Sequence, residues 1–295
     1  MSENTNTAAL PPLKKKSQLA DVWRRLKKNK TAVLGLAIFL TMAVIALAAP
    51  LIYDYKADVI KLNYQDKLQA PSAAHPFGTD EMGRDMLARI VWGARMSLSL
   101  GFITVAFALS IGGTLGAIAG YFGGTLDNVI MRIMDIFLAI PNILFAICIV
   151  AALGASTINL VIAMAVSSCP TYARVVRGPV LTVREVEYIE AARAIGANSR
   201  TIILSHVIPN CMAPIIVQTT LNIAGTILSI AGMSFLGLGI QPPTPEWGSM
   251  LSSARSYIRD YSYMAFFPGI AIMITILSLN LFGDGLRDAL DPRLK

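Results

Sequence analysis

Nucleophilic side chains stand together at one point of this sequence, where Ser167, Ser168 and Cys169 are consecutive. A hydroxyl or thiol group attacks a carbonyl carbon when a neighbouring base takes its proton. No base is evident beside these residues in the sequence, and a hydrolase inside a membrane would need one at the same depth. We therefore expect no catalytic residues, with an intramembrane protease left open as one alternative.

Metal and nucleotide chemistry are disfavoured by the residue types themselves. The chain has two histidines and three widely spaced cysteines, a pattern that predicts neither a metal site nor a disulfide framework. It also contains no Gly-Lys dipeptide, and therefore no G-x-x-x-x-G-K-[ST] phosphate loop. We expect this chain to bind no metal and no cofactor of its own.

A set of neutral polar side chains recurs at helical spacing further along. Gln218, Asn222, Thr226 and Ser229 follow one another at +4, +4 and +3, so a helix would place them on one face. Lipid penalises such a face, which must therefore meet protein or water. The stripe predicts a pore-lining surface for a polar substrate or, equally, hydrogen bonds between helices.

The elements that must position these residues are membrane helices. Only 15% of the 295 residues are charged, whereas a soluble domain has about 25%. This disfavours a soluble enzyme, a nucleic-acid-binding module and a disordered protein. Charge-free stretches long enough to cross a bilayer predict an all-α membrane protein with six spanning helices, at 31–53, 96–126, 136–153, 157–173, 212–235 and 261–283.

Basic residues are distributed unevenly between these spans, and their bias predicts orientation. With the N-terminus in the cytoplasm, the inner segments carry 17 of the 25 Lys and Arg residues, so both termini are expected inside. The absence of charges within the spans disfavours a proton-coupled carrier. The expected organisation is a basic tail (1–30), an N-terminal helix (31–53), an extracytoplasmic segment with an amphipathic helix (54–95), a five-helix core (96–283) and a cytoplasmic C-terminus (284–295).

Small residues form a row in the second predicted span. Ala108, Gly112, Gly116 and Gly120 recur at strict i, i+4 spacing. Small residues in one row let the backbones of two helices approach closely in lipid. This row predicts a tight contact between helices.

The charged segment 174–209 lies between two spans on the predicted inner side. We expect a short helix from Val183 to Arg193 that Gly196 ends, and a second helix that begins at Asn198 and stops at Pro209 near the membrane. The compact pair of helices is either a solvated loop or a docking element for a cytosolic partner.

That segment resembles a known signature. Glu190-Ala191-Ala192, three residues, Gly196, nine residues and His206-Val207-Ile208-Pro209 are similar to the E-A-A-x3-G-x9-I-x-L-P motif of the membrane subunits of ABC importers. His206 stands where Ile is usual, and Ile208 where Leu is usual. The resemblance implies that Glu190, Ala191, Ala192, Gly196 and Pro209 belong to a coupling helix seated on a cytosolic ATPase.

Longer runs resemble the permeases of dipeptide, oligopeptide and nickel importers. The run 237–248 is similar to the outer loop of their "C" subunit, and further matching runs lie at 77–85, 120–132 and 283–292. The resemblance implies a type I ABC-importer permease fold, with five core helices behind one extra N-terminal helix.

The same resemblance implies a function. The chain would form half of the pathway of an ATP-driven, binding-protein-dependent importer in a bacterial or archaeal cytoplasmic membrane. Its partners would be a related second permease, two ATPase subunits that bind ATP and Mg²⁺, and an extracytoplasmic binding protein, but no nucleic acid. Di- or oligopeptides are the expected substrates. Nickel chelates, glutathione and opines stay open, as does an ATP-independent carrier or channel.

The run 77–85, which we call the outer run, has two interpretations. Thr79 and Asp80 are residue types that cap helices, and acidic residues precede basic ones at ion-pairing distance in the sequence. The run therefore organises a local helix or contacts a partner directly. Its candidate residues are Gly78, Thr79, Asp80, Gly83, Arg84 and Asp85.

Overall fold

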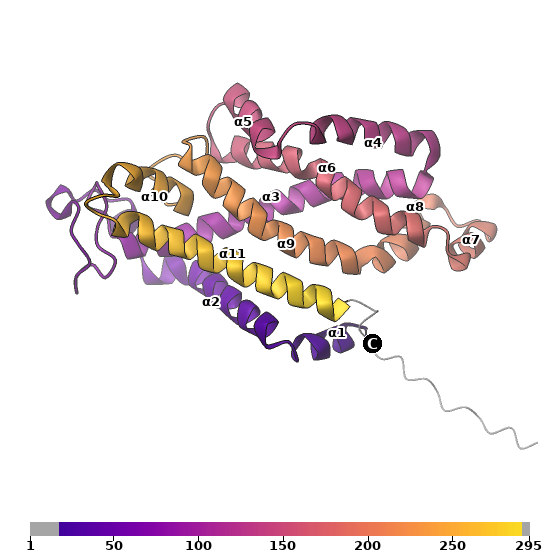
Figure 1. The fold of residues 1–295 in the computed structure, drawn as a ribbon, viewed down its shortest axis with the longest axis horizontal. Helices are drawn as coiled ribbons and strands as arrows, with labels where there is room; N and C mark the ends of the chain where they lie inside the picture. Colours follow the sequence, from indigo (N-terminus) through magenta and orange to yellow (C-terminus); the bar gives the residue numbers. More distant parts are fainter. Residues whose placement is uncertain (1–17, 291–295) are drawn as a thin grey trace, which may run out of the picture.

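The computed structural model describes residues 18–290, and these form an elongated bundle of helices (Figure 1). Most of the expected basic tail, including Lys14, Lys15 and Lys16, and the last five residues of the chain lie outside the described residues. Within the described range there is no strand, only an isolated bridge between Thr79 and Asp85.

The long helices run roughly parallel to the long axis of the molecule (Figure 1). Five helical runs are long and apolar enough to cross a membrane: α2 (Lys30–Ile52), α3 (Met86–Phe122), α6 (Thr157–Val183), the run Ser199–Phe235 and α11 (Tyr263–Leu290). The shorter helices gather at the two ends and along one side; they are α1 (Gln18–Leu26), α4 (Gly124–Leu138), α5 (Asn142–Leu153), α7 (Glu187–Ala194) and α10 (Trp247–Ala254).

The expected span at 136–153 is wrong as a single straight helix. The structure has α4 and α5 there, bent by 84° relative to each other, so six spans result only if this pair counts as one. The break falls at Pro141, which has no N–H to donate and which disfavours helical backbone at the residue before it. With 12 residues, α5 is about 18 Å long, well short of a bilayer core of about 30 Å.

Several spanning helices extend beyond the expected boundaries. α11 continues to Leu290 rather than ending at 283, and so includes the first part of the expected C-terminal segment. α3 begins at Met86 rather than at residue 96, so the expected amphipathic helix is the first turns of α3 itself, and α6 continues to Val183 rather than ending at 173. A search for charge-free stretches finds only the apolar part of a helix. The extensions of α3 and α6 carry arginines, Arg89 and Arg95 in α3 and Arg174 and Arg177 in α6.

Pro209 does not stop a helix, which corrects a second expectation. Helix runs without a break from Ser199 through α8 (Ser199–Thr201), a π-helical turn (Ile202–Val207) and α9 (Ile208–Phe235). Proline lacks the N–H that would continue the regular ladder, and the wider π turn precedes it, a local adjustment typical of interrupted helices. The Asn210 side-chain amide donates to the carbonyl of His206 at 2.6 Å.

The predicted small-residue row lies in the most extensive contact between helices, that of α3 with α6. A Cβ at Gly112 would lie 2.2 Å from the carbonyl oxygen of Cys169, and one at Gly116 would lie 2.2 Å from that of Ala173. The backbones of α3 and α6 therefore touch directly, which confirms the predicted close approach. The N-terminal helix α2 packs against α11, where Gly285 meets Ala32.

Candidate functional site

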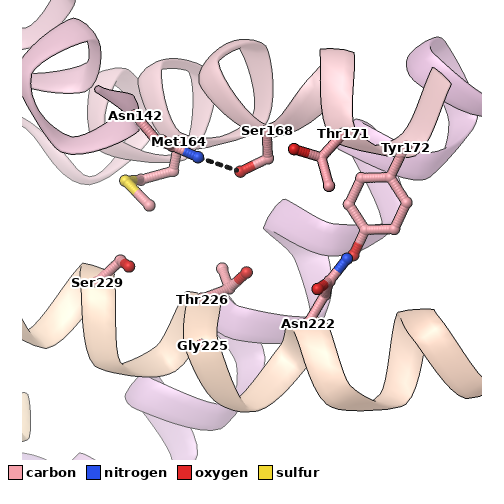
Figure 2. Close-up of a pocket in the computed structure, with 9 residues that line it drawn as sticks. All are labelled: Asn142, Met164, Ser168, Thr171, Tyr172, Asn222, Gly225, Thr226 and Ser229. Carbon is pink, nitrogen blue, oxygen red and sulfur yellow. Dashed lines mark hydrogen bonds between the residues drawn. The ribbon is translucent and has the colours of Figure 1, made fainter. Parts of the chain in front are cut away.

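A polar cavity of about 180 Å³ lies halfway along α6 and α9 (Figure 2). Asn222, Thr226 and Ser229 of α9 form one wall, as the polar stripe predicts. Gln218 does not line the cavity; its amide donates to Asn222 Oδ1 at 3.2 Å. Three of the four stripe residues therefore line the space between α9 and α6, and the fourth makes a hydrogen bond within α9.

The opposite wall comes from α6 and the start of α5. Ser168, Thr171 and Tyr172 of α6 and Asn142 of α5 line it (Figure 2). Sequence analysis missed this wall, although Ser168, Thr171 and Tyr172 share one helix face at +3 and +1.

The cavity holds hydrogen-bonding groups but no acid–base pair. Ser167 is buried and donates to the carbonyl of Met164 at 3.1 Å, so its hydroxyl is used within α6. Ser168 accepts from the Asn142 amide at 3.5 Å. Cys169 packs against Met134 and Ala173. No carboxylate, imidazole or amine lines the cavity, which disfavours the protease alternative and fits binding of a neutral polar group.

One end of the molecule, which we call the cap (residues 53–97 and 237–267), contains a buried cluster of charges. Asp80 accepts from Arg84 Nε at 2.6 Å and lies 3.3 Å from Arg89 Nε, and all three side chains are nearly inaccessible to solvent. Buried charges are stable only when they are paired and hydrogen-bonded. The outer run therefore organises the cap from within.

Arg89 ties distant segments of the cap together. Its Nη1 donates to the carbonyl oxygen of Val59 at 3.1 Å and to that of Pro243 at 3.3 Å. Together with Asp80, these contacts join α3 to the segment before it and to the loop before α10. Sequence analysis could not predict these contacts, since nothing in the sequence places residues 59 and 243 beside Arg89.

Asp85, rather than Thr79 or Asp80, caps α3. Its Oδ1 accepts from Ala88 N at 2.9 Å, and its Oδ2 lies 2.8 Å from His75 Nδ1. The hydroxyl of Thr79 is used instead to hold the chain at Gln69, whose N–H donates to it at 2.8 Å. The residue that caps α3 is therefore Asp85, whereas the sequence pattern indicates Thr79 or Asp80.

Two positions of the outer run need glycine because another backbone segment lies close to each of them. Gly83 has φ +74°, and a Cβ there would lie 1.7 Å from the carbonyl oxygen of Asn63. Gly78 has φ +75°, and a Cβ there would lie 2.6 Å from the carbonyl oxygen of Gln69. Positive φ disfavours side chains and the space excludes them, so both positions need glycine.

A buried carboxylate, Glu246, holds the second half of the cap. It caps α10 by accepting from Gly248 N at 2.9 Å and from Ser249 N at 2.8 Å, and it accepts from the Ser97 hydroxyl of α3 at 3.2 Å. Burial raises the pKa of Glu246, and the hydrogen bonds from Gly248, Ser249 and Ser97 oppose that rise. Sequence analysis assigned this residue no role.

The opposite end, which we call the α7 end (residues 120–135 and 174–208), carries the coupling-motif residues. The short helix begins at Glu187 rather than at Val183, because Val183 still belongs to α6. Gly196 turns the chain with φ +83°, and Asn198 caps the next helix by accepting from Thr201 N at 2.7 Å, both as predicted.

The coupling-motif residues divide between core and surface. Ala192 is buried with Ile189 against the start of α9, whereas Glu190 and Ala191 are exposed. Ile195, at the tip of the turn, is 85% exposed. Pro209 lies in the continuous helix behind the turn, away from this exposed surface patch of α7 and Ile195.

Arginine–carboxylate pairs at the α7 end lie closer to solvent than those of the cap. Arg177 makes a two-pronged pair with Asp127, both distances being 2.6 Å, which links α6 to α4. Arg174 and Asp135 pair at 2.6 Å with about half of each side chain exposed. Arg184 donates to the carbonyl of Gly120 at 2.9 Å.

Comparison with known proteins identifies relatives across nearly the whole chain. Residues 112–295 match the family described as binding-protein-dependent transport system inner membrane component, and residues 17–71 match the N-terminal TM domain of oligopeptide transport permease C. The dipeptide transport system permease protein of Alkalihalophilus pseudofirmus is 50% identical over 93% of this chain and 90% of its own. The glutathione transport system permease protein of Pectobacterium atrosepticum is 43% identical, and the match covers 98% of this chain and 96% of that protein.

The fold is also found among solved structures. A chain of the MetNI methionine ABC transporter, in an inward-facing conformation, matches with a TM-score of 0.57 and 19% identity. The match covers 70% of this chain and 98% of that chain. At this identity the likeness concerns the fold alone, and it agrees with the expected all-α permease fold.

Proposed function

This chain belongs to the family of binding-protein-dependent transport system inner membrane components, and from that premise we propose that it conducts di- or oligopeptides into the cell. The chain is a multi-pass membrane permease subunit of an ABC importer. The observation that carries the peptide assignment is the cavity between α6 and α9, whose neutral donors and acceptors suit a polar, uncharged backbone. Relatives that transport dipeptides support the same substrate class.

The cavity is half of a pathway. Its volume of about 180 Å³ is below the roughly 300–1,000 Å³ of typical ligand sites. A second, related permease supplies the remaining wall in this proposal. Residues of α4 that face outward, among them Ile133 and Ile136, add an apolar surface for such a neighbour.

The α7 end docks a cytosolic ATPase, which supplies ATP and Mg²⁺ chemistry that this chain does not perform. Exposed Glu190, Ala191 and Ile195 form the contact, and buried Ala192 and Ile189 fix α7 to the start of α9. Movement of the ATPases thereby reaches the polar stripe through one continuous helix. Both termini then lie in the cytoplasm, and the cap receives a loaded binding protein outside.

Glutathione is a second candidate because permeases for it share 43% identity with this chain. Glutathione is itself a small peptide, so the same cavity chemistry serves both. The two are distinguished by competition: unlabelled dipeptide should displace labelled dipeptide uptake at concentrations where glutathione does not.

The test is transport by the complete complex in liposomes, with its binding protein and a labelled dipeptide. We expect ATP-dependent accumulation and ATPase activity that the loaded binding protein stimulates. Glu190→Lys or Gly196→Trp should abolish both while the complex remains in the membrane. Asp288→Lys makes the same charge reversal on the exposed surface of α11, outside both the α7 end and the cap, and serves as the matched control. Equilibration of peptide without ATP would instead establish a carrier or channel.

A further inference from the structure

The helix α1 and the turn after it place lysines where the first spanning helix begins. Residues 18–30 contain five lysine or arginine residues and one acidic residue. Lys27, Lys28 and Lys30 are exposed. The end of α11 lies beside α1 and adds one arginine and two aspartates over residues 284–290. The combined region therefore keeps a positive charge.

Packing holds these lysines at a defined position. Leu26 of α1 is 3% exposed and lies in a small core with Ala32 of α2 and Ala289 of α11. The chain turns between α1 and α2 at Asn29, whose side chain accepts a hydrogen bond from Ala32 N at 3.2 Å. The charges of α1 are therefore fixed relative to the start of α2.

The length of α2 sets the depth of this region in a bilayer. α2 has 23 residues, which correspond to about 35 Å of helix, whereas the hydrocarbon core is about 30 Å thick. Lys30, its first residue, therefore lies at the edge of the hydrocarbon, and α1 lies beyond it at the level of the lipid headgroups. Figure 1 shows α1 at the same end of the bundle as the end of α11.

Trp23 adds an aromatic ring to the same region. Its side chain is 49% exposed, and the ammonium group of Lys27, one turn along, lies 5.1 Å from the centre of its ring. Tryptophan is enriched where a membrane meets water, because its ring is largely apolar and its N–H can donate a hydrogen bond. The stem of a lysine lies along apolar surface while its ammonium group reaches the charged layer. We call Trp23, Lys27, Lys28 and Lys30 the α1 surface.

We propose that the α1 surface binds the headgroups of anionic phospholipids in the leaflet where α2 begins. Each lysine near such a leaflet is attracted to its negative charge, and Trp23 lies beside the lysines at the edge of the hydrocarbon. Basic residues beside a span also direct its insertion, but that role requires no lasting contact with lipid in the folded protein. The inference needs only the membrane location that the family establishes, and it does not depend on the substrate.

The fluorescence of Trp23 reports which lipids contact the α1 surface. The complete complex is placed in nanodiscs that hold phosphatidylcholine and phosphatidylglycerol in equal amounts, with bromine on the acyl chains of one lipid or of the other. Bromine quenches tryptophan fluorescence on contact, and subtracting the signal of the Trp23→Phe complex isolates Trp23. We expect brominated phosphatidylglycerol to quench Trp23 more strongly than brominated phosphatidylcholine does.

Removal of three charges tests whether the lysines cause this preference. In a variant that combines Lys27→Gln, Lys28→Gln and Lys30→Gln, the preference for phosphatidylglycerol should fall at least about fivefold, the contribution expected of one lysine. Arg24 and Arg25 have interactions of their own and stay unaltered. The tail before α1 is identical in both complexes, so its own attraction to anionic lipid cancels.

The matched control removes the same number of lysines from the cap. Lys56, Lys61 and Lys67 are exposed there, and changing all three to glutamine should leave the quenching of Trp23 unchanged. Both triple variants should assemble with the same yield as the unaltered complex, because every altered side chain is exposed.

Three results would overturn the inference. Equal quenching by the two lipids in the unaltered complex would show no preference for anionic headgroups, and a preference that survives the loss of the three α1 lysines would assign it to other groups. No quenching by either lipid would show that protein covers the α1 surface. A complex that accumulates no peptide in liposomes would reject the proposed function while leaving these quenching results unaffected.

Discussion

The cap and the α7 end both use arginine–carboxylate pairs, but they place them differently. In the cap, Asp80, Arg84 and Arg89 are buried together. At the α7 end, Arg174 and Asp135 pair in contact with solvent. Buried pairs are costly to break because they leave an uncompensated charge, whereas exposed pairs contribute little. The charged pairs of the cap should therefore contribute more to stability than those of the α7 end.

The two ends also differ in how far apart in the sequence their contacting residues lie. Arg89 connects carbonyl oxygens at positions 59 and 243, and Tyr263 donates to the carbonyl of Thr79 at 2.9 Å. At the α7 end, the longest of the charged links described, Arg184 to Gly120, spans 64 positions. The cap thus gathers three remote segments into one unit, and changes there should be felt throughout the protein.

The largest effect is expected from Arg89→Met. This change leaves Asp80 partly uncompensated and frees the carbonyl oxygens of Val59 and Pro243. We expect the free energy of unfolding to fall by about 3–5 kcal/mol, as measured by thermal unfolding of the detergent-solubilised protein. A loss below about 1 kcal/mol would show that the cap is no more rigid than the α7 end.

A second effect depends on pH. Because burial raises the pKa of Glu246, the folded protein holds a proton at pH values where the unfolded chain has released it. This contribution favours folding most below the ordinary value of 4.5 and declines as pH rises toward the raised pKa. Glu246→Gln should flatten this dependence while costing about 1 kcal/mol through the weakened cap of α10. Unfolding curves recorded from pH 4 to about 8 measure both the pH dependence and the loss of stability. If the free energy of unfolding varied with pH equally in the variant and in the unaltered protein, Glu246 would not be the group responsible.

A third effect, smaller than that of Arg89→Met, is expected where the α7 end is partly buried. Asp127→Asn replaces the two-pronged pair with Arg177 by a weaker neutral contact between α4 and α6. We expect a loss of about 1–2 kcal/mol in the free energy of unfolding. Leu126→Ser, an exposed neighbour on α4, controls for nonspecific perturbation of that helix.

The smallest effect on stability should come from Arg174→Met. Its pair with Asp135 is about half exposed, so we expect a change of less than about 1 kcal/mol, and less still in high salt. A large loss in the same unfolding assay would remove the contrast between the two ends.

Sequence reasoning reached features that are local or periodic. The row at Gly112 and Gly116, the stripe at Asn222 and Thr226, and the turn at Gly196 all follow from spacing along one segment. The permease family was also recognisable, because its motifs are contiguous runs.

Features that depend on several segments could not be predicted in the same way. Proline usually ends helices, yet at Pro209 a π turn lets the helix continue. Arg89 and Glu246 acquire their roles from remote partners, and Tyr172 becomes part of a cavity only because α9 passes opposite it. A search for charge-free stretches also could not detect that α4 and α5 meet at a sharp bend.

The contact between α3 and α6 has a consequence for how this protein can evolve. The atoms that a Cβ at Gly112 or Gly116 would strike are backbone oxygens, those of Cys169 and Ala173. Every residue carries that oxygen, so no smaller side chain on α6 can make room for a larger one on α3. Packed positions usually change during evolution through paired, compensating substitutions. No such pair can accommodate a side chain at either of these glycines.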